Sequence, residues 1–283
     1  MQYLLGLYEK SMPNHLSWEE KMYFTKEAGY DFLEVSIDES DKKQARLNMS
    51  QEERLKLVTL CNKIGVPIKT MCLSGHRKYP LGSSEAETAA RSLVIMEKAI
   101  ELACDLGIRI IQIAGYDVYY EESTPKTVAR FKTNLAKCVK IAAKNGVVLG
   151  FETMETAFMN TVEKAMKYVN EINSPYLKVY PDIGNLTNSN LMYNTNLLDD
   201  LEIGKGSINA CHLKETVPNV FREVEYGAGH VNFVSCIEKL WDIGVRMFVG
   251  EFWYTGNNNW QDILIRNHKF LRDKFDQIPQ VLD

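Results

Sequence analysis

The stretch "VVLGFETME", residues 147–155, contains the feature that decides the fold. Val147 to Phe151 have the composition of a strand that is buried on both faces, as strands of parallel sheets are. The run ends on Glu152, a carboxylate that is costly to bury without a partner. Because side chains alternate along a strand, Glu152 is expected to point inward with Val148 and Gly150. A buried strand that ends on a carboxylate is typical of a parallel barrel, whose functional groups lie at the carboxyl ends of its strands.

The same helix, stop and strand unit recurs along the chain. Segments with helical spacing of apolar residues end on a glycine, which suits the left-handed conformation at a helix end, and a β-rich run follows each segment. These glycines are Gly29, Gly65, Gly107, Gly146 and Gly244. The expected helix starts place a capping residue three positions before a glutamate or directly before a proline: Ser17 with Glu20, Ser50 with Glu53, Asn160 with Glu163, and Thr124 before Pro125.

Eight β-rich runs are predicted near residues 3–8, 32–37, 68–74, 109–115, 147–153, 177–183, 208–214 and 246–252. They alternate with helical patterns without a linker between them, which favours one (β/α)₈ TIM barrel domain over residues 1–283. A doubly wound nucleotide-binding sheet is disfavoured, because no G-x-G-x-x-G follows the first run and no G-x-x-x-x-G-K-[ST] occurs. Gly227 and Gly229 in "YGAGHVNF" are interpreted as a loop that lets the backbone approach a ligand or a neighbouring segment.

Composition excludes several classes of function. The 283 residues are 45% hydrophobic and 25% charged, with a formal net charge of -4. This balance gives no general attraction to nucleic acid or to anionic membranes, and neither a signal peptide nor a spanning run is found, so a cytoplasmic protein is expected. Six cysteines without a C-x-x-C pair are expected to be reduced thiols.

Four predicted strands end on groups that bind metals. Glu152, Asp182, His212 and Glu251 each follow an apolar run, and the spacing between them is about one βα unit. They are therefore expected to converge at one mouth of the barrel, as a mixed oxygen and nitrogen set suited to one divalent ion such as Zn²⁺, Mn²⁺, Mg²⁺ or Co²⁺. The alternative is four ordinary polar residues at strand ends, in which case three carboxylates would crowd one imidazole.

Several loops carry a narrower resemblance. The segments are "MCLSGHRKYPLGS" at 71–83, "IQIAGYDVYYEE" at 111–122, "YPDIGNL" at 180–186, "CHLKET" at 211–216 and "FREVEYGAGHVNF" at 221–233. With them the chain resembles the xylose-isomerase-like barrel superfamily, and more narrowly the L-ribulose-5-phosphate 3-epimerases, also called L-xylulose-5-phosphate 3-epimerases, of ascorbate and pentose catabolism. The resemblance extends over nearly the whole chain.

The resemblance implies a metal-dependent isomerase that inverts C3 of a ketopentose phosphate through an enediolate. Glu152 and Glu251 match the catalytic pair of the family, with one glutamate for each face of C3, and Asp182 and His212 would complete the metal site. The substrate would be a small sugar phosphate, and a homo-oligomer, as a dimer, is expected.

Candidate substrate-binding residues lie near the predicted mouth: Ser74, His76, Arg77, Lys214, Arg222 and Glu34. Lys214 is the first choice for the phosphate, because it lies two residues beyond His212 and hence on the same side of the strand. Glu34 is expected to contact a sugar hydroxyl, to support the site from behind, or to make a structural hydrogen bond.

Three other functions stay open at this point. A hexulose-6-phosphate isomerase would use related chemistry, and a non-catalytic sugar-binding barrel would need no opposed glutamates. A metal-dependent endonuclease of the same superfamily would need several histidines at strand ends and a basic face, whereas only His212 is placed at a strand end.

Overall fold

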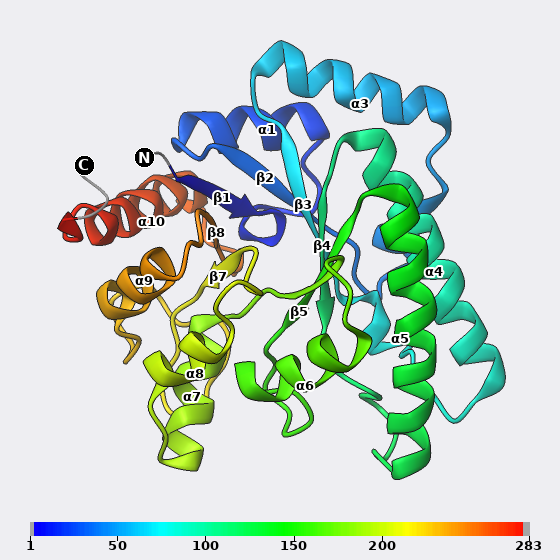
Figure 1. Ribbon diagram of the computed structural model, residues 1–283. Coiled ribbons are helices and arrows are strands. Elements are labelled where there is room, and N and C mark those ends of the chain that lie inside the picture. Colours follow the sequence, from blue (N-terminus) through cyan, green and yellow to red (C-terminus); the bar gives the residue numbers. More distant parts are fainter. Residues whose placement is uncertain (1–2, 280–283) are drawn as a thin grey trace.

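The structure is a computed structural model that describes residues 3–279. Within these residues, eight parallel strands curl into a barrel, and helices surround it (Figure 1). The strands are β1 (Leu4–Tyr8), β2 (Phe32–Ser36), β3 (Ile68–Leu73), β4 (Ile110–Ala114), β5 (Val148–Glu152), β6 (Leu177–Val179), β7 (Cys211–Leu213) and β8 (Met247–Gly250). Their order is β6-β5-β4-β3-β2-β1-β8-β7, which confirms the α/β barrel predicted from the sequence.

The barrel closes between β6 and β7, which are shorter than the predicted runs 177–183 and 208–214. Between residues 3 and 279, the strand pairing across this seam is limited to the isolated bridges Val179–Ile208 and Asp182–His212. Pro181 has no amide hydrogen to donate, and Asp182 already begins the next helix as its N-cap. The seam therefore lies between two of the four strands that carry the candidate metal ligands.

Helices follow the strands on the outside of the barrel (Figure 1). They are α1 (Trp18–Glu27), α2 (Asp41–Gln44), α3 (Gln51–Ile64), α4 (Ala86–Leu106), α5 (Pro125–Asn145), α6 (Val162–Ile172), α7 (Ile183–Tyr193), α8 (Leu197–Ile203), α9 (Phe233–Asp242) and α10 (Trp260–Phe275), with 3₁₀ turns η1 (Glu9–Ser11), η2 (Ala45–Asn48) and η3 (Ser74–Arg77). None of the helices between residues 3 and 279 has the length and apolarity needed to cross a bilayer.

Most of the predicted helix ends are confirmed. The five expected glycines all have positive φ, and Ser17, Ser50 and Thr124 cap α1, α3 and α5. The prediction of Asn160 as a cap is wrong by one residue. Thr161 caps α6 and accepts from the amide of Lys164, while Asn160 binds the side chains of Lys164 and Tyr193.

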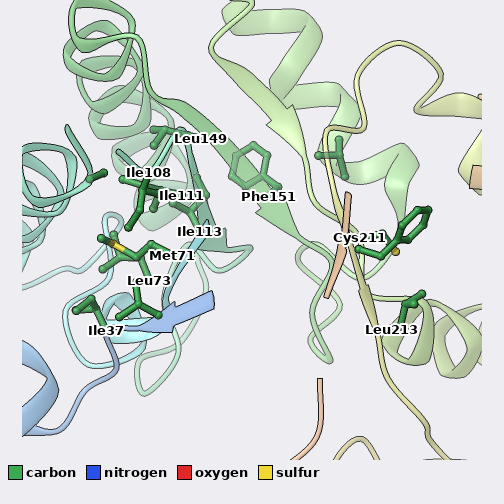
Figure 2. Close-up of a cluster of buried hydrophobic side chains, with 14 of the residues drawn as sticks. Ile37, Met71, Leu73, Ile108, Ile111, Ile113, Leu149, Phe151, Cys211 and Leu213 are labelled. Carbon is green, nitrogen blue, oxygen red and sulfur yellow. The ribbon is translucent and has the colours of Figure 1, made fainter. Parts of the chain in front are cut away.

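Alternation along the strands separates two apolar layers. Side chains such as Leu149 and Phe151 face the helices, and Figure 2 shows Leu149 close to Ile111 and Ile113 of the neighbouring strand in this outer layer. The interior of the barrel holds a smaller cluster of Tyr8, Phe32, Cys72, Tyr180, Ala210 and Val249. The polar groups at the carboxyl ends of the strands thus rest on an interior that is already filled.

A buried carboxylate anchors the turn between β1 and α1. Glu9 contacts Lys21, Lys43 and Arg46, and its Oε2 also accepts from the amide of Ser36 at 2.9 Å. The Glu9 side chain is completely buried, and the three cations hold its pKa well below the usual range although burial opposes them. This cluster fixes the residue that follows, Lys10, whose side chain lines the mouth of the barrel.

Replacing Glu9 with Gln is expected to lower the free energy of unfolding by about 3 kcal/mol at pH 7, because two buried lysines and the partly buried Arg46 lose their carboxylate. The pKa of Glu9 in the folded state lies below its unfolded value of about 4.3. The stability that it contributes is therefore complete above this pH and is lost as the pH falls below it.

Urea unfolding of both proteins between pH 7 and pH 3 tests this prediction. The difference between them should shrink in acid. Glu52→Gln removes one partner of an exposed ion pair with Lys56 and should cost less than about 1 kcal/mol. Equal effects of the two substitutions, or a difference that does not depend on pH, would contradict the proposed role of Glu9.

Candidate active site

Glu152, Asp182, His212 and Glu251 converge at the carboxyl ends of β5, β6, β7 and β8. One ligand atom from each residue lies within 4.8 Å of those of the other three, and all four residues are buried. The four strands are consecutive around the barrel, so the two glutamates lie at the ends of the group and Asp182 and His212 lie between them. The convergence predicted from the strand ends is thus present in the structure.

Asp182 serves the fold and the site at once. Its Oδ1 accepts from the amide of Asn185 at 2.8 Å and thereby caps α7, while its own amide donates to Thr153 Oγ1 at 3.0 Å. These contacts hold the second oxygen, Oδ2, towards the cluster. Glu251 is fixed from the opposite side, because its amide donates to the carbonyl of Leu213 at 2.9 Å and so ties the end of β8 to β7.

The electrostatics of the cluster favour a bound cation. Burial raises the pKa of Asp182 to about 8, with Glu251 adding to the rise and Lys214 opposing it. Burial also raises the pKa of Glu152. Within residues 3–279, neither Asp182 Oδ2 nor Glu251 Oε2 accepts a well-aligned hydrogen bond, although Lys214 Nζ lies 2.7 Å from the first and His212 Nδ1 lies 3.1 Å from the second. The donor set of three carboxylates and one imidazole therefore fits a divalent metal ion.

Lys214 lies inside the cluster. Its Nζ is 2.7 Å from Asp182 Oδ2, 3.6 Å from Glu251 Oε2 and 2.8 Å from Asn185 Oδ1. The residue is only 4% exposed. Burial lowers the pKa of its ammonium group, but the carboxylates of Asp182 and Glu251 outweigh this effect, so the pKa is raised. Lys214 therefore neutralises carboxylates at the base of the pocket, whereas the sequence suggested a cation for the phosphate.

Two further sequence candidates do not line the pocket. His76 is turned away from the mouth, and its Nε2 lies 3.1 Å from the carbonyl of Ser92. Burial lowers the pKa of His76 to about 4. Glu34 is fully buried beneath the cluster, where its Oε1 lies 2.6 Å from His212 Nε2. His76 therefore does not face the pocket, and Glu34 lies in the supporting position that was one of the alternatives for it.

A small pocket opens above the cluster. Of the sequence candidates, it is lined by Glu152, Glu251, Ser74, Arg77, Lys214 and Arg222. Residues that sequence reasoning did not propose as binding residues also line it: Tyr8, Lys10, Cys72, Met154, Glu155, Asn185 and Phe221. Lys10 comes shortly after the end of β1, and Asn185 lies in the first turn of the helix that Asp182 caps, so their positions in the chain were a usable signal.

Apart from Lys214 at the base, the cations that line the pocket lie in the segments around its rim. Lys10 pairs with Asp38 at 2.6 Å, and Arg222 lies 3.6 Å from Glu155. Arg77 packs over the ring of Tyr119, with 4.8 Å between its guanidinium carbon and the ring centre, and its buried Nε finds no acceptor within residues 3–279. The pocket is thus acidic at its base and basic at its rim.

The glycine-rich loop around Gly229 contacts a neighbouring segment of the protein. Glu215 accepts from the amides of Thr216, Gly227 and Val231, so the loop wraps around its carboxylate. A side chain at Gly229 would place its Cβ 2.1 Å from the carbonyl oxygen of Thr216. This close approach of two backbone segments requires a glycine, and it fixes the segment that follows β7.

Comparison with known proteins agrees with this geometry. Residues 22–274 match the family model of the xylose isomerase-like TIM barrel. The L-ribulose-5-phosphate 3-epimerases UlaE of Salmonella paratyphi A and of Escherichia coli O157:H7 are each 43% identical to this chain over 236 residues, which cover 83% of the chain and 82% of the relative.

Solved structures share the fold at low sequence identity. A D-tagatose 3-epimerase-like protein aligns with a TM-score of 0.80 at 17% identity, over 99% of this chain and 100% of the other. An L-ribulose 3-epimerase aligns with a TM-score of 0.74 at 18% identity, over 98% and 94% of the two chains. The chain therefore belongs to the xylose isomerase-like TIM barrel family, as a member of its L-ribulose-5-phosphate 3-epimerase group of isomerases.

Proposed function

We propose that this protein is a metal-dependent 3-epimerase that interconverts L-ribulose 5-phosphate and L-xylulose 5-phosphate. The observation that carries the proposal is the placement of two buried glutamates, Glu152 and Glu251, at the two ends of the cluster that also contains Asp182 and His212. The relatives named L-ribulose-5-phosphate 3-epimerase supply the substrate class.

Inversion at C3 needs a base on one face of the sugar and an acid on the other. In the proposed reaction, one glutamate removes the C3 proton and leaves an enediolate, and the opposite glutamate returns a proton to the other face. The roles of Glu152 and Glu251 exchange when the reaction runs backwards. Their positions on β5 and after β8, with two strands between them, support the assignment of one glutamate to each face of C3.

Glu152, Asp182, His212 and Glu251 would hold one Zn²⁺, Mn²⁺, Mg²⁺ or Co²⁺ ion. A divalent ion bound there would supply Lewis-acid polarisation of the substrate's carbonyl group, which acidifies the neighbouring C3 proton. The glutamates need this help, because a carboxylate is a weak base towards a carbon acid.

Lys214 and Asn185 are proposed to orient the sugar. Both line the pocket beside Asp182, and the ammonium group of Lys214 is held 2.8 Å from Asn185 Oδ1. A positive charge that is already fixed in a buried site stabilises negative charge on a substrate oxygen without reorganisation.

The phosphate is proposed to bind at the basic rim. Arg77, Lys10 and Arg222 line the pocket from three different loops, with Ser74 near Arg77. Arg77 is the strongest candidate, because its buried Nε lacks an acceptor and a guanidinium binds phosphate through two parallel hydrogen bonds. This arrangement separates the phosphate from the carboxylates that act at C3.

Proton exchange in D₂O tests the proposed function. The purified protein should incorporate deuterium at C3 of L-ribulose 5-phosphate and form L-xylulose 5-phosphate, and NMR follows both events. Removal of divalent metal with a chelator should stop both. Turnover of a hexulose 6-phosphate in place of the pentulose phosphates would favour the isomerase alternative, and binding without turnover would favour a sugar-binding barrel.

The expected dimer and the expected cytoplasmic location are further predictions, tested by light scattering and by cell fractionation.

Replacing Asp182 with Asn, or His212 with Ala, is expected to weaken metal binding at least tenfold, because each change removes a proposed ligand. The asparagine can still cap α7, since Asn and Asp are equally good caps, so the fold should persist. Metal analysis beside circular dichroism measures both properties. Full metal occupancy in either variant would remove that residue from the proposed ligand set.

Replacing Glu152 or Glu251 with Gln is expected to lower the rate of epimerisation by a factor of about 10² to 10⁴, the usual contribution of a general acid or base. Each variant keeps one carboxylate and therefore serves one face of C3. Any remaining deuterium exchange should start from opposite epimers in the two variants.

Metal content must be measured in both variants, because both residues are also proposed ligands. Glu163→Gln is a matched control, since Glu163 is exposed on α6, and it should leave the rate unchanged. A metal-loaded Gln variant at either site that epimerises at nearly the wild-type rate would refute the two-base mechanism.

A further inference from the structure

The proposed mechanism gives no role to Glu34, a buried carboxylate directly behind the cluster. Glu34 lies on β2 inside the barrel and is completely buried, at the side of His212 opposite the other carboxylates. An ionised carboxylate in such a position is costly unless it is hydrogen-bonded on both oxygens. Its partners therefore indicate what the residue does.

Both oxygens of Glu34 are used. Thr70 Oγ1 and Tyr180 Oη donate to Oε2 at 2.7 and 2.9 Å. Oε1 lies 2.6 Å from Nε2 of His212. All four side chains are completely buried, and they come from four parts of the barrel wall: β2, β3, β7 and the residue after β6. The network therefore spans the interior of the barrel beneath the cluster.

The two nitrogens of the His212 ring face different surroundings. Nδ1 points to the cluster, 3.1 Å from Glu251 Oε2 and 3.7 Å from Glu152 Oε1, whereas Nε2 points to Glu34. A carboxylate can only accept a hydrogen bond, and Glu34 is closer to Nε2, at 2.6 Å, than Glu251 is to Nδ1, at 3.1 Å, so the proton of a neutral imidazole is favoured on Nε2. The Gln112 amide nitrogen, a donor, lies 3.0 Å from Nδ1 and 3.3 Å from Nε2, and its shorter contact fits an Nδ1 that carries the lone pair on the side of Glu251 and Glu152.

The ring is also held sterically. Tyr180 packs edge-on against it, with ring centres 5.1 Å apart and an angle of 76° between the planes. Tyr180 thus supports both the imidazole and the carboxylate that orients it. A ring fixed in this way loses little freedom when its nitrogen binds an ion.

We infer that Glu34, held by Tyr180 and Thr70, is a positioning residue that fixes the tautomer and orientation of His212 for metal binding. The inference rests on the proposed function only in that the cluster binds a divalent ion. Carboxylates behind metal-binding histidines typically contribute 10- to 100-fold to metal affinity. Glu34 acts through His212 and does not touch the substrate.

Glu34→Gln is the main test. The amide has the same shape, and the hydroxyl groups of Tyr180 and Thr70 can turn to accept from it, so the barrel should still fold. The charge that holds the Nε2 proton is lost. Titration of the metal-free protein with Co²⁺, in competition with a chromophoric chelator, should give an affinity about 10- to 100-fold lower than that of the wild type. The visible spectrum of bound Co²⁺ should also change, because it reports ligand geometry.

Asp200→Asn is the matched control. Asp200 is also a buried carboxylate, and it accepts from the amides of Val162 and Glu163 at the start of α6, away from the cluster. This variant should lower the thermal midpoint of the metal-free protein without changing the affinity for Co²⁺. A purely structural role of Glu34 would give the same pattern for Glu34→Gln.

Tyr180→Phe keeps the inference testable if Glu34→Gln fails to fold. It removes one donor to Glu34 and should lower the Co²⁺ affinity several-fold, whereas Tyr30→Phe, which removes a buried hydroxyl outside the barrel interior, should not. A Co²⁺ affinity of Glu34→Gln within about twofold of the wild type would overturn the inference alone. A wild-type protein that binds no divalent ion would overturn the proposed metal site together with it.

Discussion

The burial of charge at the mouth of an apolar barrel is the constraint on which the rest of the structure depends. Three carboxylates of the cluster and Glu34 beneath it are buried, where Lys214 lies close to Asp182 and Glu251 and the imidazole of His212 lies against Glu34. Such a site is stable only with excellent hydrogen bonding or with a further cation. The Asp182 cap and the Glu34 network both follow from this requirement.

The barrel walls are built to present these groups. Each side chain of the cluster comes from the end of a strand whose helix-facing residues pack in the outer layer, so the fold supplies rigid positions and the loops supply the rim. The side chains at the rim are less tightly held, because the ion pairs Lys10–Asp38 and Arg222–Glu155 are partly exposed to solvent. Fixed carboxylates at the base of the pocket and cations in the loops at its rim are consistent with the proposed reaction at C3 and with a phosphate that binds some distance away.

The sequence predicted the barrel and the cluster because both depend on local patterns: apolar runs, glycine stops and the residue type at each strand end. It did not predict what depends on side-chain direction over long distances in the chain. His76 points to Ser92, although it belongs to a segment that was expected to meet a substrate. The contact of Glu34 with His212 joins residues 178 positions apart, which spacing cannot reveal.

The central claim is that Glu152 and Glu251 serve opposite faces of C3. A crystal structure of the metal-loaded protein with L-ribulose 5-phosphate tests this claim most directly. It should place one carboxylate oxygen of each glutamate within about 3.2 Å of the C3 substituents, on opposite sides of the carbon, with the phosphate at the basic rim. Both glutamates on the same face of C3, or either of them out of reach, would contradict the account.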